Sequence, residues 1–351
     1  MSAAYATFAL APATRAGGVL AGGEYQVHRD FLDFIVDGRP LLFRLSDLDA
    51  VSPLASDVPP ALFTAQVRAL LLEAAAPLPG GRYIVYGCPE CEDLACGAVT
   101  AVIRRDGEDG EDYVWRDFAW QTGPEADLRL NGYHGIGPFR FPGAEYRAVL
   151  TTLLGGGTAA PRRRVLLIGA RVAALARLAA ALRTIDIGAD ITHDATDTSA
   201  DELRRYGAVA FGPAVTDEQR AAVRAAFTAA RADVTYVDGS APGVPLSVPL
   251  LVARIEHALD RTPPARRRLT RLAAAGGAAG IEITSPCRVR LTAYRLDRLR
   301  RVRVHELFDG VLPAGAHRVA LDPVLTRGRA WLVARASESV LTAPVTHGEG
   351  S

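Results

Sequence analysis

Three cysteines lie within nine residues of this sequence: Cys88, Cys91 and Cys96. Two thiolates separated by two residues can bind one metal ion from a tight turn, and the third thiolate follows five residues later. Four cysteines in 351 residues do not form a disulfide framework, and their clustering is typical of metal or redox use. Three interpretations stay open for this segment: ordinary cysteines in a turn, a structural metal site that takes zinc, and a pair of redox or catalytic thiols.

A zinc site needs four ligands, so the three cysteines require one more donor. His134 is the candidate, because it follows in the same segment on a glycine-rich loop; Cys287 serves only if the C-terminal part folds back. The neighbouring carboxylates are expected to raise the thiol pKa values and so to disfavour a reactive thiolate. They belong to Glu90, Glu92 and Asp93.

A second group of candidate residues follows the strands predicted in the middle of the chain. In a parallel α/β sheet, ligands bind beyond the carboxyl ends of the strands. Asp194 lies 25 residues after Gly169, near the spacing expected for an acid that binds a ribose. The residues that could bind a cofactor, NAD(P) or flavin, are Gly169, Arg171, Asp194, Gly212 and Asp238.

The phosphate-binding fingerprint is incomplete at this position. The dinucleotide motif G-x-G-x-x-G needs three glycines, and this chain has Gly169-Ala-Arg-Val-Ala-Ala174. Arg171 can contact a phosphate directly, or it can be a solvated residue of the first helical turn. A structural or degenerate α/β domain is therefore the alternative to nucleotide binding.

The composition excludes several chemistries. All forty basic residues are arginine, because the sequence contains no lysine. A Schiff-base lysine, a PLP enzyme, a Walker A loop and a Tyr-x-x-x-Lys dehydrogenase pair are thus impossible. The net charge of +1 provides no strong field for nucleic acid, and the arginine runs lack interleaved aromatic residues. We expect no nucleic-acid partner.

The sequence shows no sign of membrane targeting. The N-terminal residues carry no charge before Arg15 and no continuous apolar stretch, which is not the pattern of a signal peptide. No window of about 18 residues is apolar and uncharged, so no membrane span is predicted. We expect a cytoplasmic protein without membrane contact.

Composition divides the chain into three domains and two linkers, a multidomain α/β plus β fold. Glycine runs, a proline and arginine runs mark the linkers. We predict an α+β domain with a cysteine hairpin at 1–153, a linker at 154–163, a Rossmann-like α/β domain at 164–262, a second linker at 263–280 and an Ig-like β-sandwich at 281–347.

Hairpins dominate the first predicted domain. Asp37-Gly38 between apolar runs predicts paired strands at 31–35 and 41–45, and Pro59-Pro60 opens a helix that runs to about Glu73. The other expected elements are strands at 83–86, 98–105, 113–121 and 139–141 and a helix at 143–153.

Strands and helices alternate in the second predicted domain, which favours a parallel sheet covered on both faces. Its strands are expected at 165–168, 190–193, 208–211 and 234–237, and its helices at 171–182, 199–205, 216–230 and 247–260. The third domain is dense in strands, which favours a sandwich. They are expected at 288–294, 302–307, 317–321, 330–336 and 340–345.

The third domain resembles a known family through four short stretches. They are Val289-Arg-Leu-Thr-Ala-Tyr294, Leu307-Phe-Asp-Gly-Val-Leu312, Ala314-Gly-Ala-His-Arg318 and Gly328-Arg-Ala-Trp331. About 60 residues look like the Ig-like domain of flagellar hook-capping proteins and related C-terminal sorting domains. The resemblance implies a sandwich fold and carries over no role in flagella or secretion.

The first domain resembles a group of uncharacterised actinobacterial proteins. The resemblance rests on Cys88-Pro-Glu-Cys-Glu-Asp-Leu-Ala-Cys96-Gly-Ala-Val99, Val114-Trp-Arg-Asp-Phe118 and Gly137-Pro-Phe139. Some relatives of the whole chain are labelled oxidoreductases. The resemblance therefore implies an oxidoreductase activity, without a mechanism or a substrate.

Two hypotheses for the function follow. The first is a cytoplasmic binding, scaffold or regulatory protein with a protein partner or a homo-oligomeric state, stabilised by a metal at the cysteines. The alternative is an NAD(P)- or flavin-dependent oxidoreductase that uses the α/β cleft without a catalytic lysine. A thiol redox protein working through Cys88 and Cys91 is the third possibility.

Overall fold

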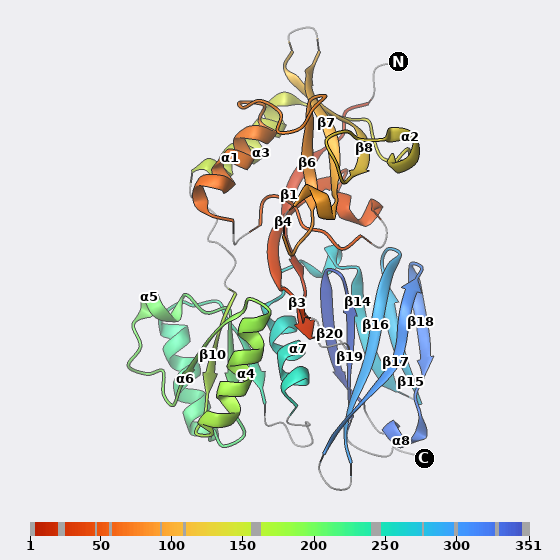
Figure 1. The fold of residues 1–351 in the computed structure, drawn as a ribbon. Coiled ribbons are helices and arrows are strands. Elements are labelled where there is room, and N and C mark those ends of the chain that lie inside the picture. The colour runs from red at the N-terminus through yellow and green to blue at the C-terminus, as the bar shows by residue number, and fades with distance from the viewer. Residues whose placement is uncertain are drawn as a thin grey trace. The chain divides into compact units, whose positions relative to one another are not determined.

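The computed structural model shows a mixed α/β chain with one parallel sheet and several antiparallel sheets (Figure 1). The chain divides into two compact units: unit 1 consists of residues 1–15 and 29–160, and unit 2 of residues 16–28 and 161–351. The structure describes residues 4–19, 25–45, 48–55, 58–91, 93–107, 110–155, 163–239, 247–275, 277–297, 301–326 and 330–345.

In its described residues, unit 1 contains two antiparallel sheets and three α-helices. The first sheet has the order β1-β4-β5, with β1 (Phe8–Arg15), β4 (Arg29–Val36) and β5 (Arg39–Pro40). The second has the order β6-β7-β8-β9, with β6 (Arg82–Gly87), β7 (Ala98–Asp106), β8 (Asp112–Gln121) and β9 (Phe139–Phe141). The helices are α1 (Pro60–Leu70), α2 (Leu128–Asn131) and α3 (Gly143–Leu154).

The hairpin predicted around Asp37-Gly38 is confirmed, but its second strand is short. Asp37 and Gly38 have φ of 52° and 73°, as a tight hairpin turn requires. After β5 the chain forms a 3-10 helix at Leu41–Arg44 in place of the strand expected at 41–45. Leu41 and Leu42 are both fully buried, whereas neighbouring residues of a strand point to opposite faces.

An aromatic core lies between the elements of unit 1. Trp115 is fully buried, and the rings of Phe8, Phe34 and Phe141 lie edge-on to it at centroid distances of 5.7, 5.1 and 5.9 Å. Aromatic pairs in this geometry add to the free energy gained by burying their area. This core holds β1, β4, β8 and β9 in register and so supports the loop that carries the cysteines.

Unit 2 contains the parallel sheet, and all four of its strands are confirmed. The order is β11-β10-β12-β13, with β10 (Arg164–Ile168), β11 (Gly188–Thr192), β12 (Ala208–Phe211) and β13 (Thr235–Asp238). The connecting helices are α4 (Val172–Thr184), α5 (Ala200–Leu203), α6 (Asp217–Ala229) and α7 (Val248–Leu259).

The helices cover both faces of the parallel sheet. Leu178 of α4 and Ile255 of α7 share a core with Leu167 of β10, and Leu203 of α5 and Phe227 of α6 belong to the core on the opposite face. A capping box at Thr216 and Gln219 starts α6, within the helix expected at 216–230. The central strands β10 and β12 are almost entirely buried and apolar, whereas the edge strands β11 and β13 are only partly buried and carry polar residues.

The rest of unit 2 is built mainly from antiparallel strands. One sheet has the order β14-β15-β18, with β14 (Leu269–Ala275), β15 (Ala278–Ile283) and β18 (Gly315–Ala320). The other has the order β17-β16-β19-β20, with β16 (Cys287–Leu296), β17 (Val302–Leu312), β19 (Ala330–Ala336) and β20 (Ser339–Pro344). The remaining elements are β2 (Gly18–Val19), β3 (Tyr25–Gln26) and the short helix α8 (Pro323–Thr326).

Strands occupy part of the stretch predicted as the second linker. The sequence predicts a linker at 263–280, whereas β14 and the start of β15 lie there and pair antiparallel. Alanine and glycine have low strand propensity, so the composition hides these strands. Burial of Ala274, Ala279 and Ile281 against the facing sheet stabilises them.

Helix α7 uses two faces at once. Val252 and Ile255 pack on the parallel sheet, while Leu250 and Ala253 pack on Val333 and other residues of a separate core. The parallel sheet and the antiparallel strands therefore share one helix within unit 2. The three-domain division of the chain stays a prediction.

Candidate functional site

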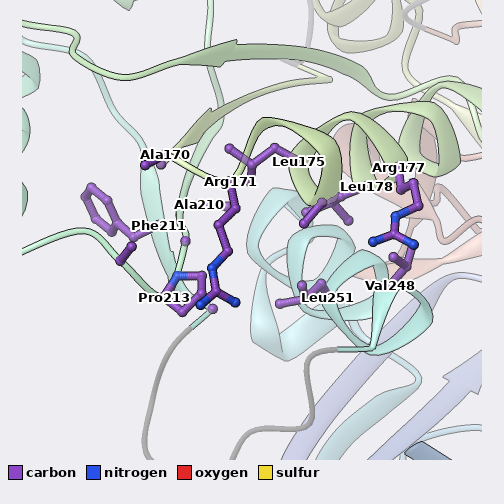
Figure 2. A pocket seen from close by; sticks show the side chains of 15 residues that line it. Ala170, Arg171, Leu175, Arg177, Leu178, Ala210, Phe211, Pro213, Val248 and Leu251 are labelled. Carbon is purple, nitrogen blue, oxygen red and sulfur yellow. The ribbon is translucent and has the colours of Figure 1, made fainter.

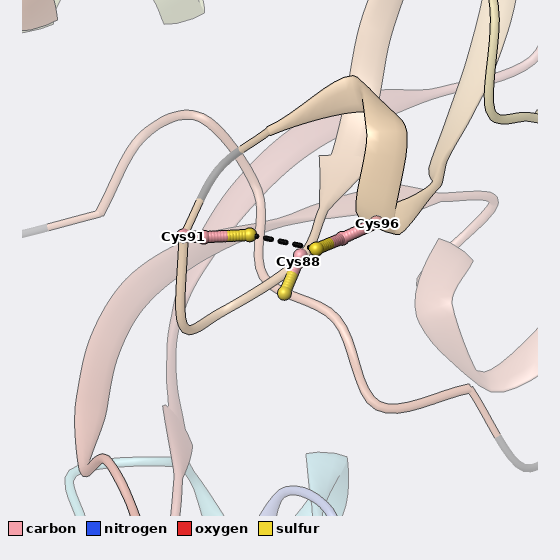
Figure 3. A group of neighbouring side chains, drawn as sticks. All are labelled: Cys88, Cys91 and Cys96. Carbon is pink, nitrogen blue, oxygen red and sulfur yellow. Dashed lines mark hydrogen bonds between the residues drawn. The ribbon is translucent and has the colours of Figure 1, made fainter.

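The three clustered cysteines come together in the loop between β6 and β7 (Figure 3). The sulfur atoms of Cys88, Cys91 and Cys96 all lie within 4.8 Å of one another, and those of Cys91 and Cys96 are 3.0 Å apart. Cys88 is half-buried, and the other two are exposed. This loop can therefore present three thiols to one ion.

Contacts at both ends hold the cysteine loop. Gly87, the last residue of β6, exchanges two backbone hydrogen bonds with Val51, of 2.9 and 3.1 Å. At the other end, Gly97 has φ of 101°, and a Cβ atom there would lie 2.0 Å from the ring of Trp120. Only glycine fits this close approach, so Trp120 sets the position at which the chain leaves Cys96.

A buried arginine anchors the loop from β1. The Arg15 guanidinium binds both carboxylate oxygens of Asp49, at 2.9 and 2.6 Å, and Glu90 at 2.6 Å. Burial lowers the pKa of Arg15, but the two carboxylates overcome this effect and raise it. Because Glu90 lies between Cys88 and Cys91, this ion pair fixes the start of the loop.

The acidic neighbours do not decide the pKa of Cys91, although the charge of Asp93 raises it as expected. Its pKa is lowered, because the Cys96 thiol and the backbone N–H of Asp93 donate hydrogen bonds to its thiolate. The pKa of Cys96 is raised to about 11 by the same hydrogen bond and by the Cys91 charge. Arg15 neutralises Glu90, and the Asp93 carboxylate accepts the N–H of Ala95.

The predicted fourth ligands are not part of the cluster. His134 is exposed and does not belong to the metal-compatible group, and Cys287 is fully buried in the core of unit 2. Glu92 lies outside the described residues. Within the described ranges, the three cysteines form the only group with metal-ligand spacing.

A pocket of about 360 Å³ lies at the carboxyl edge of the parallel sheet (Figure 2). Gly169, Gly212 and Gly239 line it, and each directly follows one of the strands β10, β12 and β13. Strands β10 and β12 are neighbours in the sheet, and the chain continues from them toward opposite edges of the sheet. The crevice beyond the ends of two such strands is where open α/β sheets usually bind ligands.

The pocket contains three of the five predicted cofactor-binding residues. Gly169, Arg171 and Gly212 line it, whereas Asp194 and Asp238 do not. The Asp194 carboxylate accepts the N–H of Thr196 at 2.9 Å, and such hydrogen bonds lower its pKa. Asp238 forms an ion pair with Arg220 of α6.

The glycines that follow β12 and β13 have a packing role. A Cβ atom on Gly239 would lie 2.7 Å from the carbonyl oxygen of Phe211, and one on Gly212 would lie 3.2 Å from that of Ile168. The end of β13 therefore requires glycine at 239, and the end of β12 leaves little room for a side chain at 212, even without a phosphate to bind.

The sequence signals for several supporting residues are weak. Arg15 contacts the cysteine loop although it lies 73 positions before Cys88. Trp120 contacts the loop from 24 positions after Cys96. Arg177 and Leu251 line the pocket from α4 and α7. The helical spacing Arg171, Leu175, Leu178 on one face of α4 is the one sequence signal that could have indicated the pocket wall.

No protein-family model, no curated protein and no solved structure matches this chain. The resemblances to hook-capping and actinobacterial proteins therefore stay predictions. Of the helices that the structure describes, none has the length and apolar character needed to cross a membrane.

Proposed function

We propose that unit 1 binds one zinc ion through Cys88, Cys91 and Cys96, and that the chain is a binding or scaffold protein stabilised by this ion. The observation that carries the proposal is the approach of all three sulfur atoms to within 4.8 Å. In a tetrahedral site with Zn–S bonds of about 2.3 Å, the sulfur atoms lie about 3.8 Å apart. The cluster reaches this spacing through small side-chain movements of two exposed cysteines.

The chain's own residues prepare this site. Arg15 holds Glu90, so that carboxylate adds little negative charge next to the thiolates. The Asp93 N–H and the Asp93 carboxylate, which caps the 3-10 turn Leu94–Cys96, stabilise the loop around Cys91. When bound, zinc would neutralise thiolate charge and link the two ends of the loop.

The fourth coordination position supports a role in partner binding. No further ligand lies with the three cysteines in the described part of the chain, so water or a side chain of a partner would fill this position. Cys91 and Cys96 are exposed, so a partner can reach the ion. A protein partner or a second copy of this chain fits this arrangement.

The fold supports two finer assignments that belong to this proposal. The strand order β11-β10-β12-β13, which is 2-1-3-4 along the chain, with helices on both faces, supports a doubly wound Rossmann-like unit with the flavodoxin-like strand order. The two antiparallel sheets that enclose one apolar core favour an Ig-like β-sandwich. An NAD(P)- or flavin-dependent oxidoreductase is the weaker proposal, because Asp194 and Asp238 do not line the pocket.

The test is elemental analysis of the full chain purified without chelator. We expect about one equivalent of zinc, retained in His134→Ala and lost when Cys88, Cys91 and Cys96 are replaced together by serine. Cys287→Ala is the matched control for loss of a thiol elsewhere. Full zinc content in the triple variant would refute the site.

A dithiol function through Cys91 and Cys96 is a second candidate, favoured by their sulfur distance of 3.0 Å. Zinc-free protein whose Cys91 and Cys96 form a disulfide in mild oxidant would support it. Mass spectrometry of the peptide that contains both residues distinguishes this outcome from the zinc site.

A further inference from the structure

The pocket of unit 2 has apolar walls and a positively charged rim. Leu175 and Leu178 of α4 and Val248 and Leu251 of α7 form the walls. Two arginines line the same space, and no lining residue in the described part of the chain is acidic. An apolar cavity of about 360 Å³ is at the lower end of the range for small-molecule sites.

The charge of the rim is concentrated where α4 begins. Arg171 is the residue that precedes the first turn of α4, and Figure 2 shows its guanidinium directed toward Pro213 across the pocket. No ion-pair partner for Arg171 occurs among the described residues. An anion beside this guanidinium would also meet the positive end of the α4 dipole.

A second helix starts at the same pocket. Val248 is the first residue of α7, and neither α4 nor α7 receives a capping hydrogen bond from a side chain. Arg177 lies farther along α4 and lines the pocket together with Val248 (Figure 2). Its apolar stem can cover the ligand while its charge stays in water.

We propose that this pocket binds a small organic carboxylate with an apolar body. The carboxylate lies at Arg171, and the apolar body packs against Leu175, Leu178 and Leu251. A planar guanidinium binds a carboxylate through two parallel hydrogen bonds, which gives both affinity and orientation.

A dinucleotide fits these residues less well. Asp194, the acid expected to bind ribose, is outside the lining, and so is Asp238, which is already paired with Arg220. Dinucleotides lie across two mononucleotide-binding halves of a sheet, and this sheet has four strands in the described residues. The glycines after β12 and β13 are explained by strand packing.

The test is calorimetric titration of the full chain with octanoate, compared with octanol, acetate and AMP. We expect octanoate to bind at least about tenfold more tightly than octanol or acetate, because only octanoate has both a carboxylate and a long apolar chain. Absence of octanoate binding at millimolar concentration would overturn the proposal. Tighter binding of AMP would assign the pocket to phosphate-containing ligands instead and would also overturn it.

Three variants locate the binding. Arg171→Gln is expected to weaken octanoate binding about tenfold or more, whereas Arg205→Gln, which removes the same charge from an exposed position outside the pocket, leaves it unchanged. Ala174→Leu fills the cavity from α4 without changing charge or helix propensity, and it is expected to abolish binding. Circular dichroism confirms folding of each variant, and octanoate affinity that survives both Arg171→Gln and Ala174→Leu contradicts the assignment.

Discussion

The cysteine cluster of unit 1 and the pocket of unit 2 are assembled in different ways. All three candidate ligands of the cluster come from nine consecutive residues, and their spacing is visible in the sequence. The pocket walls come from α4, α7 and the ends of three strands, over residues 169 to 251. A local site needs distant residues only as supports, whereas a site at a sheet edge does not exist until the strands pair.

The supports of the cluster are nevertheless distant. Arg15, Val51 and Trp120 hold the loop from β1, from an isolated bridge and from β8. The comparison therefore predicts that unit 1 responds strongly to metal and to these supports. It also predicts that unit 2 responds to neither.

Metal removal is expected to have the largest effect. At free zinc about 1,000-fold above the dissociation constant, the bound ion raises the free energy of unfolding by about 4 kcal/mol. Chelation should lower the stability of unit 1 by this amount and leave unit 2 unchanged. Calorimetry with hydrogen exchange of the β6 and β7 amides measures both, and an equal loss of stability in both units would contradict the local character of the site.

Substitution of Gly97 tests how tightly Trp120 holds the loop. Gly97→Ala introduces a Cβ atom 2.0 Å from the Trp120 ring at a positive φ, which we expect to cost about 2–4 kcal/mol of stability. Gly80→Ala is the matched control, because Gly80 has φ of 72° and no heavy atom near its Cβ position. Urea unfolding compares the two, and equal losses would show that backbone strain alone sets the requirement for glycine.

Loss of Arg15 tests the anchor of the loop. Arg15→Gln removes the ion pairs with Asp49 and Glu90, and we expect it to cost about 1–2 kcal/mol, because the arginine is buried but both carboxylates are partly exposed. It should also weaken zinc binding. Arg104→Gln removes an exposed arginine of the same unit as the control. Zinc affinity that is unchanged by Arg15→Gln would mean that the loop holds its shape without the anchor.

The smallest expected effect is the order in which the thiols react. In zinc-free protein at pH 8, iodoacetamide should modify Cys91 before Cys96, because the pKa of Cys91 is lowered and that of Cys96 is raised to about 11. As pH rises, the thiolate therefore forms first on Cys91. Cys96→Ala removes the hydrogen bond, so the pKa of Cys91 should rise and its alkylation should slow. Peptide mass spectrometry follows both sites, and faster modification of Cys96 would reverse the assignment.

Regular local patterns predicted much of the fold. The four parallel strands and their helices were readable, because apolar runs alternate with capped amphipathic segments. The paired strands β7 and β8 were also readable, because strands were expected at 98–105 and 113–121. The cysteine loop is placed correctly for the same reason, because it lies between two predicted strands.

Other elements depend on contacts that no local pattern shows. Strand β1 contains Pro12, which a strand accepts at the edge of a sheet, and β1 is the edge strand beside β4. Arg268 belongs to an arginine run in the stretch predicted as the second linker, yet it is fully buried and pairs with Glu338 at 3.0 Å. The burial of Arg268 follows from its pairing with Glu338, and the sequence does not show that the two residues meet.

The sequence alone determined the candidate ligands, the absence of lysine chemistry and the alternation that forms the parallel sheet, because these depend on residue type and short spacing. Only the tertiary structure decided that Arg15 neutralises Glu90, that the Cys91 thiolate is stabilised and that Asp194 and Asp238 do not line the pocket. These outcomes depend on distances of a few ångströms between residues far apart in the chain. Electrostatic and hydrogen-bond interactions change strongly over such distances, so their sign and partners follow from packing rather than from sequence spacing.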